Sequence, residues 1–472
     1  MKYKLPLATA LALLLATPAR ATEPPSERTC HLPGSEDALR CMTLPVPLDY
    51  GKPGAGTLRL HVTVARAYRE AARPDPLFVL AGGPGEAGSD VLPLLSGAFK
   101  RARATRDIVF IDQRGTGLSG KLDCPMPQED TMGDEQLDAL VRACIANSRA
   151  PFAAYTTQAA ARDIEQVRQA LGYGKINVWG GSYGTRLAQA YARAYPGSVR
   201  TLLLDAVAAP DQVIPAGGRD SQASLDKVFD LCARDAACHK AYPSLKQEFA
   251  ALVESAAAGV KLSLPDPRTA RPVSFTMSST RFLGTVHNIL YSPADARRLP
   301  FLVHTAYQGN WAPFVARQNL FSDLSAEGSN ALLLHLAVVC AEDVPRMTPA
   351  LLAADAGVLT APMAKRIVPL CAAMKVPAVP YKAPSRIDAP ALLLSGALDP
   401  VTPPHRAEEA ARHMAHAQHV VVANAGHGVS QLPCAARVLR EFLDRPDKPV
   451  DARCLSEIPA PTFQLGSAGP QP

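Results

Sequence analysis

The chain has 472 residues, of which 47% are hydrophobic, enough to bury a large core and too many for one minimal domain. Its formal charge of +6 falls to about +3 for residues 22–472, because residues 1–21 hold three basic and no acidic side chains. Lys and Arg are dispersed without basic runs, which argues against nucleic acid and anionic membranes as partners.

The N-terminal segment combines Lys2 and Lys4, an apolar run over residues 5–16, and the small-residue motif A-R-A at 19–21. This is the pattern of a signal peptide, with cleavage expected after Ala21. The apolar run is too short to cross a bilayer as an anchor, and no later stretch reaches membrane length. We therefore expect an exported protein without a membrane anchor.

Six short apolar runs are typical of buried strands in a parallel sheet, because they are continuous rather than alternating. They span residues 76–81, 107–111, 176–179, 201–204, 391–395 and 419–423. Helical stretches such as 159–171 and 185–195 separate several of them. Strands that alternate with helices predict an α/β fold whose sheet is wound by right-handed crossovers.

The alternation stops between about residues 209 and 385. The stretches richest in helix formers there are 221–233, 244–258 and 331–340. Because strand-like runs return afterwards, residues 209–385 are interpreted as a largely helical insertion rather than as a separate downstream domain. The insertion would divide a core made of residues 22–208 and 386–472.

Ten cysteines in an exported chain predict disulfide bonds. Local pairing is the simplest expectation, although spacing alone does not establish connectivity. The sequence neighbours are Cys30 and Cys41, Cys124 and Cys144, Cys232 and Cys238, Cys340 and Cys371, and Cys434 and Cys454. No pair has C-x-x-C spacing, and His413, His416 and His419, which would share a helical face, have no acidic partner motif. We therefore expect neither a metal site nor a cofactor.

The most informative motif is Gly180-Gly181-Ser182-Tyr183-Gly184, between a predicted strand and a predicted helix. G-x-S-x-G in this context is a nucleophile elbow, a sharp turn that exposes the serine to a base. Glycines on both sides avoid collisions with the neighbouring strand and helix. We therefore expect Ser182 to be a catalytic nucleophile rather than an incidental turn residue.

A serine nucleophile needs a histidine base and an acid that orients it. Asp399 and His427 each follow a predicted strand, at the edge of a parallel sheet where ligand sites form. With Ser182 they have the chain order Ser, Asp, His. Asp205 also ends a predicted strand and is the alternative acid.

The tetrahedral intermediate of such a reaction needs two backbone N–H donors, the oxyanion hole. One is expected from Tyr183, the residue after the nucleophile. The other is expected from the loop L-A-G-G-P-G at residues 80–85, where glycines expose the backbone. Pro84 has no N–H group, so Gly83 is the predicted donor.

Three of these motifs together resemble the prolyl iminopeptidase group of α/β-hydrolases: GGPG after a strand, DQRGTGLS from Asp112 to Ser119, and GGSYG. The signal peptide, the length, the cysteine-rich ends and the run L-D-P-V-T-P around Asp399 resemble its exported tripeptidyl-aminopeptidase branch, which has a characteristic C-terminal segment. One departure is Ala81, where prolyl iminopeptidases usually carry histidine. Asp112 and Arg114 are expected to be structural supports of the active-site loops.

The resemblance implies an α/β-hydrolase fold with the insertion over the active site. It also implies a serine aminopeptidase that removes a short unit, a tripeptide or a proline-type residue, from peptides with a free amino end. An esterase or amidase acting on small acyl substrates would use the same five residues. An inactive hydrolase fold that only binds ligands is the third interpretation.

An aminopeptidase must also bind the substrate ammonium, and a buried ammonium needs a carboxylate partner. Glu342 and Asp343, after the predicted helix at 331–340, are the candidates from the insertion. The resemblance favours Glu342, because it includes an acid shortly after a cysteine in this region, here Cys340. The alternative is a helix end whose acids are solvated or paired with an arginine such as Arg346.

Overall fold

The computed structural model describes residues 25–52, 54–125, 132–266, 269–318, 330–355 and 359–469. The predicted signal peptide therefore lies outside the described residues. None of the helices in these ranges has the length and hydrophobicity that crossing a membrane requires.

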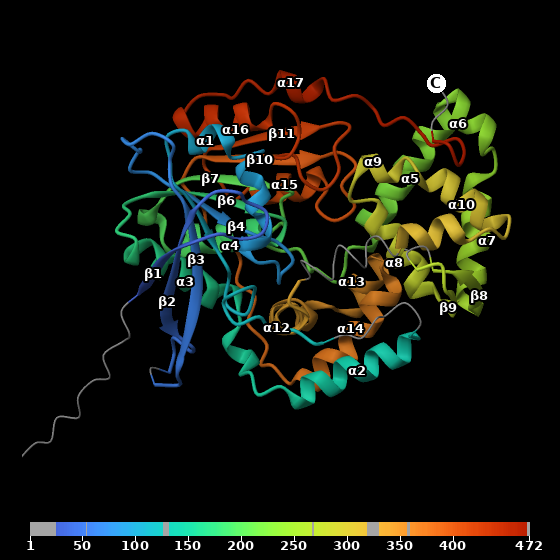
Figure 1. Cartoon of the computed structure of the whole chain (residues 1–472), viewed down its shortest axis with the longest axis horizontal. Coiled ribbons are helices and arrows are strands. Elements are labelled where there is room, and N and C mark those ends of the chain that lie inside the picture. The colour runs from blue at the N-terminus through green and yellow to red at the C-terminus, as the bar shows by residue number, and fades with distance from the viewer. Residues whose placement is uncertain are drawn as a thin grey trace, which may run out of the picture.

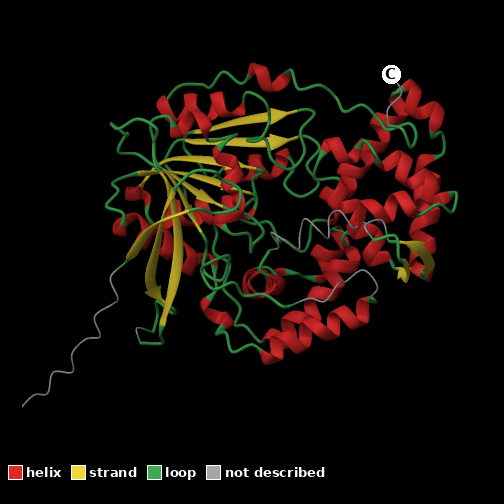
Figure 2. Cartoon of the chain, viewed as in Figure 1, coloured by secondary structure: helices red, strands yellow, loops and turns green. Residues whose placement is uncertain are grey.

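A twisted sheet lies at the centre of the fold (Figures 1 and 2). Within the described residues it has nine strands in the order β1-β2-β3-β5-β4-β6-β7-β10-β11. The strands are β1 (Ser26–Cys30), β2 (Leu39–Pro47), β3 (Thr57–Ala65), β4 (Leu77–Leu80), β5 (Ile108–Ile111), β6 (Ile176–Gly181), β7 (Val199–Asp205), β10 (Ala391–Gly396) and β11 (Ala417–Val422). Neighbours are antiparallel from β1 to β5 and parallel from β5 to β11. The predicted α/β fold is confirmed.

Each predicted strand is present, but the three strands β1 to β3 were not predicted. Strands β2 and β3 carry polar side chains such as Arg40, Arg59 and Thr63 among apolar ones, so they lack a continuous apolar run. The expectation of a shared histidine face was wrong, because His419 lies in β11 with Nε2 3.0 Å from Ser395 Oγ.

Helices cover both faces of the sheet. On β4, Phe78 and Leu80 pack in one hydrophobic cluster, and Leu77 and Val79 pack in another, because successive side chains point to opposite faces. The first cluster includes residues of α3 (Thr157–Ala170), α4 (Tyr183–Ala194) and α15 (Pro404–Ala411), and the second includes residues of the 3-10 helix η1 (Gly88–Leu95), α1 (Lys100–Arg103) and α16 (Ala435–Asp444). Burial on both faces explains why the strands are continuous apolar runs.

Between β7 and β10 the described chain forms helices and one hairpin, to the right of and below the sheet in Figure 1. These elements are α5 (Gly218–Arg234), α6 (Ala236–Ala241), α7 (Leu245–Ala258), β8 (Val260–Pro265), β9 (Pro272–Met277), α8 (Ser279–Ile289), α9 (Pro293–Ala296), α10 (Leu299–Tyr307), α12 (Leu332–Glu342), the 3-10 helix η5 (Val344–Arg346), α13 (Pro349–Ala354) and α14 (Ala361–Met374). Phe249, Phe282 and Phe314 pack in a separate core made by this region. Helix α12 is different, since Leu333 and Leu336 join the cluster under α3 and α4.

Three further elements lie between the core strands, namely α2 (Asp134–Asn147) and the 3-10 helices η3 (Phe152–Ala154) and η4 (Pro196–Ser198). In Figure 1, α2 lies alongside α14, and the ion pair of Arg366 with Asp138 joins these two helices. This part of the core therefore supports the region inserted between β7 and β10.

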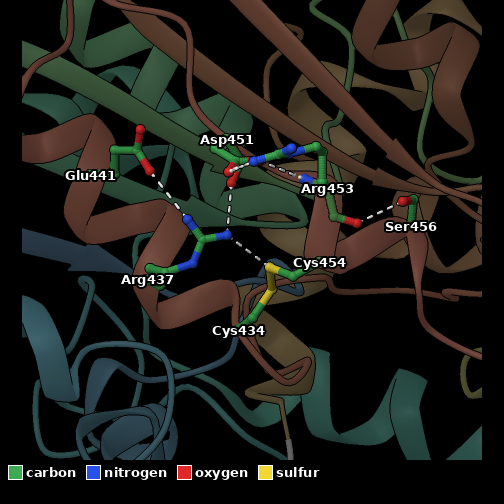
Figure 3. The surroundings of a disulfide bond; sticks show 7 residues. All are labelled: Cys434, Arg437, Glu441, Asp451, Arg453, Cys454 and Ser456. Carbon is green, nitrogen blue, oxygen red and sulfur yellow. Dashed lines mark hydrogen bonds and ion pairs between the residues drawn. A yellow bond between two sulfur atoms is a disulfide. The ribbon is translucent and has the colours of Figure 1, made fainter.

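The C-terminal segment begins on the sheet side and ends on the inserted region, as its red trace shows in Figure 1. Its start is held by the disulfide between Cys434, before α16, and Cys454, in α17 (Arg453–Ser456). Figure 3 shows Arg437 beside this bond, donating to Asp451 O at 2.9 Å and to Cys454 Sγ at 3.0 Å. Further on, Phe463 is buried in the core of the inserted region.

All ten cysteines form disulfides, each with its neighbour in the sequence as predicted. The pairs are Cys30–Cys41, Cys124–Cys144, Cys232–Cys238, Cys340–Cys371 and Cys434–Cys454.

The purified protein is therefore expected to contain no reactive thiol before reduction, because such bonds form and persist in oxidising compartments. Maleimide labelling under denaturing, non-reducing conditions, followed by mass measurement, counts the free thiols. Labelling after reduction is the control and should modify all ten cysteines. Finding most of them free without reductant would contradict the disulfide framework and the export that it supports.

Candidate active site

The predicted nucleophile stands on a tight turn between β6 and α4. Ser182 has φ 53° and ψ −123°, a backbone conformation that residues other than glycine rarely adopt. A Cβ on Gly180 would lie 2.4 Å from Gly184 O, and one on Gly184 would lie 2.1 Å from Leu80 O. The turn therefore requires glycine on both sides of the serine, as the elbow motif predicts.

His427 and Asp399 meet at the ends of the two last strands of the sheet. The loops after β11 and β10 bring His427 Nδ1 to 2.9 Å from Asp399 Oδ2. The other carboxylate oxygen accepts the N–H groups of Val401 at 2.8 Å and Thr402 at 2.9 Å. The Asp399 side chain is fully buried, so this pair is shielded from solvent on the acid's side.

Each member of the pair stabilises the charge of the other. Burial alone would lower the pKa of His427, but the Asp399 carboxylate outweighs burial and raises it. Burial alone would raise the pKa of Asp399, but His427 and the loop amides outweigh burial and lower it. Asp399 is therefore ionised at neutral pH and stabilises a protonated His427.

Asp205, the alternative acid, bonds to the backbone of the histidine loop. Its carboxylate oxygens accept the N–H groups of Val429 at 2.8 Å and Ser430 at 2.7 Å. Its own carbonyl accepts the N–H of Ser182 at 3.0 Å. Asp205 thus connects the loops of Ser182 and His427, while Asp399 is the carboxylate that bonds to the histidine ring.

Ser182 and His427 line one cavity of about 860 Å³. Gly82 and Gly83 line it too, and a Cβ on Gly82 would lie 3.1 Å from Ser182 Cβ, so the glycine loop lies directly against the nucleophile. Tyr291, from the inserted region, also lines the cavity and packs edge-to-face on the His427 ring at 4.9 Å between centroids. The structure therefore brings Gly83, Ser182 and His427 to one space, with Asp399 behind the histidine.

The side chain of Tyr183 points away from this cavity. It is buried, and its hydroxyl lies 2.8 Å from Thr157 Oγ1. The backbone N–H of Tyr183 belongs to the first turn of α4, where amides have no intrahelical acceptor. The predicted contribution of Tyr183 to the oxyanion hole therefore concerns this amide and not the phenol.

Asp112 and Arg114 brace the loops beside the sheet, as expected. Asp112 accepts the N–H groups of Ser89 at 2.7 Å and Leu118 at 2.8 Å. Arg114 is buried and bonds to Asp163 through both Nε and Nη2 at 2.7 Å. Neither residue is among those that line the Ser182 cavity in the described chain.

Neither Glu342 nor Asp343 is among the described residues that line the Ser182 cavity. Glu342, at the end of α12, accepts from Thr157 N at 2.7 Å and Thr157 Oγ1 at 2.6 Å, so it neutralises the start of α3. Asp343 is fully buried against Arg186 at 3.1 Å. Among the described residues these acids therefore pair with the N-terminus of α3 and with Arg186, and not with Arg346. Their binding of a substrate ammonium stays a prediction.

Glu86 lines the Ser182 cavity and was missed from the sequence. Its Oε2 accepts the N–H of Gly82 at 2.7 Å, and burial raises the pKa of its carboxyl. The only signal was its position directly after the glycine loop, in G-G-P-G-E. Nothing in the sequence indicated that the chain turns the side chain back toward Gly82.

The fold and this site define the class of protein. The family model described as the alpha/beta hydrolase fold matches residues 75–430, and the chain belongs to that family. Similar proteins include the tripeptidyl aminopeptidase of Streptomyces coelicolor, 29% identical over 194 residues, and the serine protease Hip1 of Mycobacterium tuberculosis, 29% identical over 245 residues. The proline iminopeptidase of Neisseria gonorrhoeae is 35% identical over 139 residues.

These matches are partial on both sides. They cover 37%, 47% and 29% of this chain and 36%, 45% and 34% of the respective relatives, so the chain spans less than half of each relative's length. The names of the relatives confirm the resemblance that the motifs predicted.

Proposed function

We propose that this chain is an exported serine hydrolase that acts as an aminopeptidase, with Ser182 as nucleophile, His427 as base and Asp399 as the acid that orients it. The observation that carries the proposal is that Ser182, on its strained turn, shares a cavity with a histidine whose Nδ1 is held by a buried carboxylate at 2.9 Å. The peptidase names of the relatives support an amide substrate, and the disulfides support export.

The reaction follows from these positions. Ser182 Oγ attacks the scissile carbonyl carbon and gives its proton to His427 Nε2, while Asp399 stabilises the imidazolium that forms. The N–H groups of Gly83 and Tyr183 donate to the developing oxyanion. The imidazolium then protonates the leaving amine, and water hydrolyses the acyl-enzyme by the same proton transfers in reverse.

One substrate panel tests the proposal against its alternatives. It compares chromogenic amides of one, two and three residues, with free and with acetylated amino ends, and p-nitrophenyl esters of short acids. An aminopeptidase cleaves the free-amine amides much faster than their acetylated counterparts. Hydrolysis of the esters alone would assign an esterase instead, and no turnover of any substrate would assign a binding protein.

The pH profile follows from the charge of His427. The base must be neutral to accept the serine proton, and Asp399 raises its pKa above the ordinary 6.5. We therefore expect kcat/KM to fall on the acidic side with a midpoint above pH 6.5, measured on the preferred amide in buffers of constant ionic strength. An acidic midpoint below 6.5 would contradict the described charge balance.

A further inference from the structure

The cavity that holds Ser182 is acidic, although the chain as a whole is basic. Within the described residues its lining includes the carboxylates of Glu86, Asp90 and Asp205 and neither lysine nor arginine. The whole chain has a formal charge of +6. Clefts of one charge sign concentrate ligands of the opposite sign, so this cavity favours a cationic group of the substrate.

The three carboxylates differ in what already satisfies them. Both oxygens of Asp205 accept backbone N–H groups of the histidine loop. Asp90 is exposed to solvent and accepts the N–H of Ala87 at 3.0 Å. Glu86 uses one oxygen for the N–H of Gly82, and its other oxygen has no hydrogen-bond partner among the described residues. Glu86 is therefore the half-buried carboxylate that keeps one oxygen open for a ligand.

Glu86 is also close to the nucleophile. The point where a Cβ would stand on Gly82 lies 3.1 Å from Ser182 Cβ and 3.3 Å from Glu86 Oε2, so both groups flank the same spot. In a substrate, the α-ammonium nitrogen lies about 2.5 Å from the carbonyl carbon of its own residue. Each further residue adds about 3.3 Å, so the ammonium of a tripeptide unit lies about 9 Å from the scissile carbonyl. Because Ser182 and Glu86 flank one spot, Glu86 lies nearer to the nucleophile than the ammonium of a tripeptide unit would reach, and its position suits a unit of one residue.

We propose that Glu86 binds a primary ammonium of the substrate and, by its position beside Ser182, selects for release of a single residue. The inference rests on the proposed hydrolase function. A bound ammonium supplies the donor that the free carboxylate oxygen lacks, which offsets the cost of burying the carboxylate. The ammonium that this spacing fits is the α-amino group, and the side chain of a lysine at the cleaved residue is the other source that the test separates.

Glu86→Gln removes the charge and keeps an oxygen that accepts from Gly82, so the glycine loop remains held. The readout is the ratio of kcat/KM for alanine p-nitroanilide to that for its N-acetyl derivative. We expect this ratio to fall about 100-fold, since loss of one member of a buried charge pair is strongly unfavourable. Asp90→Asn removes a charge from the same cavity at an exposed position and is expected to change the ratio less than about 3-fold.

Equal decreases of this ratio in the two variants would overturn the inference, because the effect would then come from the net charge of the cavity and not from binding at Glu86. An unchanged ratio in Glu86→Gln, with amide cleavage intact, would overturn it as well. Preference of the unaltered enzyme for trialanine p-nitroanilide would overturn the selection of single residues. The proposed function fails separately, if neither amides nor esters are hydrolysed.

Two further substrates assign the source of the ammonium. If the loss in Glu86→Gln falls on alanine p-nitroanilide, the site binds the α-ammonium. If it falls on N-acetyl-lysine p-nitroanilide, the site binds the lysine side chain and the selection of single residues is overturned. Glu342→Gln is the second comparison, and a loss confined to free-amine substrates in that variant would move the ammonium site to Glu342 and overturn the assignment to Glu86.

Discussion

Replacing Ser182 with alanine is expected to lower kcat by about four or more orders of magnitude while the protein folds normally. The substitution removes the attacking oxygen but keeps the Cβ, so the backbone at φ 53° is under the same constraint in both proteins. Turnover of the preferred amide, together with circular dichroism and thermal unfolding, measures the two parts of this expectation.

The matched control is Ser96→Ala, at an exposed position after η1 and outside the cavity lining. It should keep the turnover and the melting temperature of the unaltered protein. Full turnover by a pure preparation of Ser182→Ala would remove Ser182 from the mechanism.

Asp399→Asn is expected to lower kcat about 10⁴-fold, by analogy with triads whose orienting carboxylate is neutralised. The asparagine side chain is neutral, so the Nδ1–H of His427 can no longer donate to a charged acceptor. The variant has a second signature, because loss of the carboxylate removes the largest contribution that raises the pKa of His427. The acidic limb of the pH profile should therefore move to lower pH.

Asp205→Asn is the comparison for this prediction. An asparagine at this position has one acceptor oxygen for two backbone donors, so we expect a lower melting temperature. We also expect far more remaining activity than in Asp399→Asn, because the histidine ring keeps its carboxylate partner. The reverse order of the two activities would transfer the role of the acid to Asp205.

The strands that could be predicted from the sequence are those whose local residue pattern has a single physical cause. Strands β6, β7 and β10 are buried on both faces, so they are continuous apolar runs that a single pass along the chain finds. The hairpin of β8 and β9 has a solvated face, and its alternating pattern is weak beside the helix formers around it.

The site shows the same division. Ser182, Asp399 and His427 follow strands directly, so the edge of the sheet on which they lie could be predicted. The surroundings of Asp343 could not, because its partner Arg186 is 157 residues away in the chain. The position of a residue in the chain does not tell which cavity its side chain faces. For the same reason Glu86 was not predicted, although it immediately follows the glycine loop.

The C-terminal segment limits how far the inserted region can move from the sheet. Cys454 is bonded to Cys434 at the start of α16, and Phe463 is buried in the core of the inserted region. The eight residues between Cys454 and Phe463 let these two positions separate by at most about 30 Å when the chain is fully extended. A wider separation would have to extract Phe463 or reduce the disulfide. A single proteolytic cut after Ile458 would remove this connection without changing any described residue that lines the Ser182 cavity.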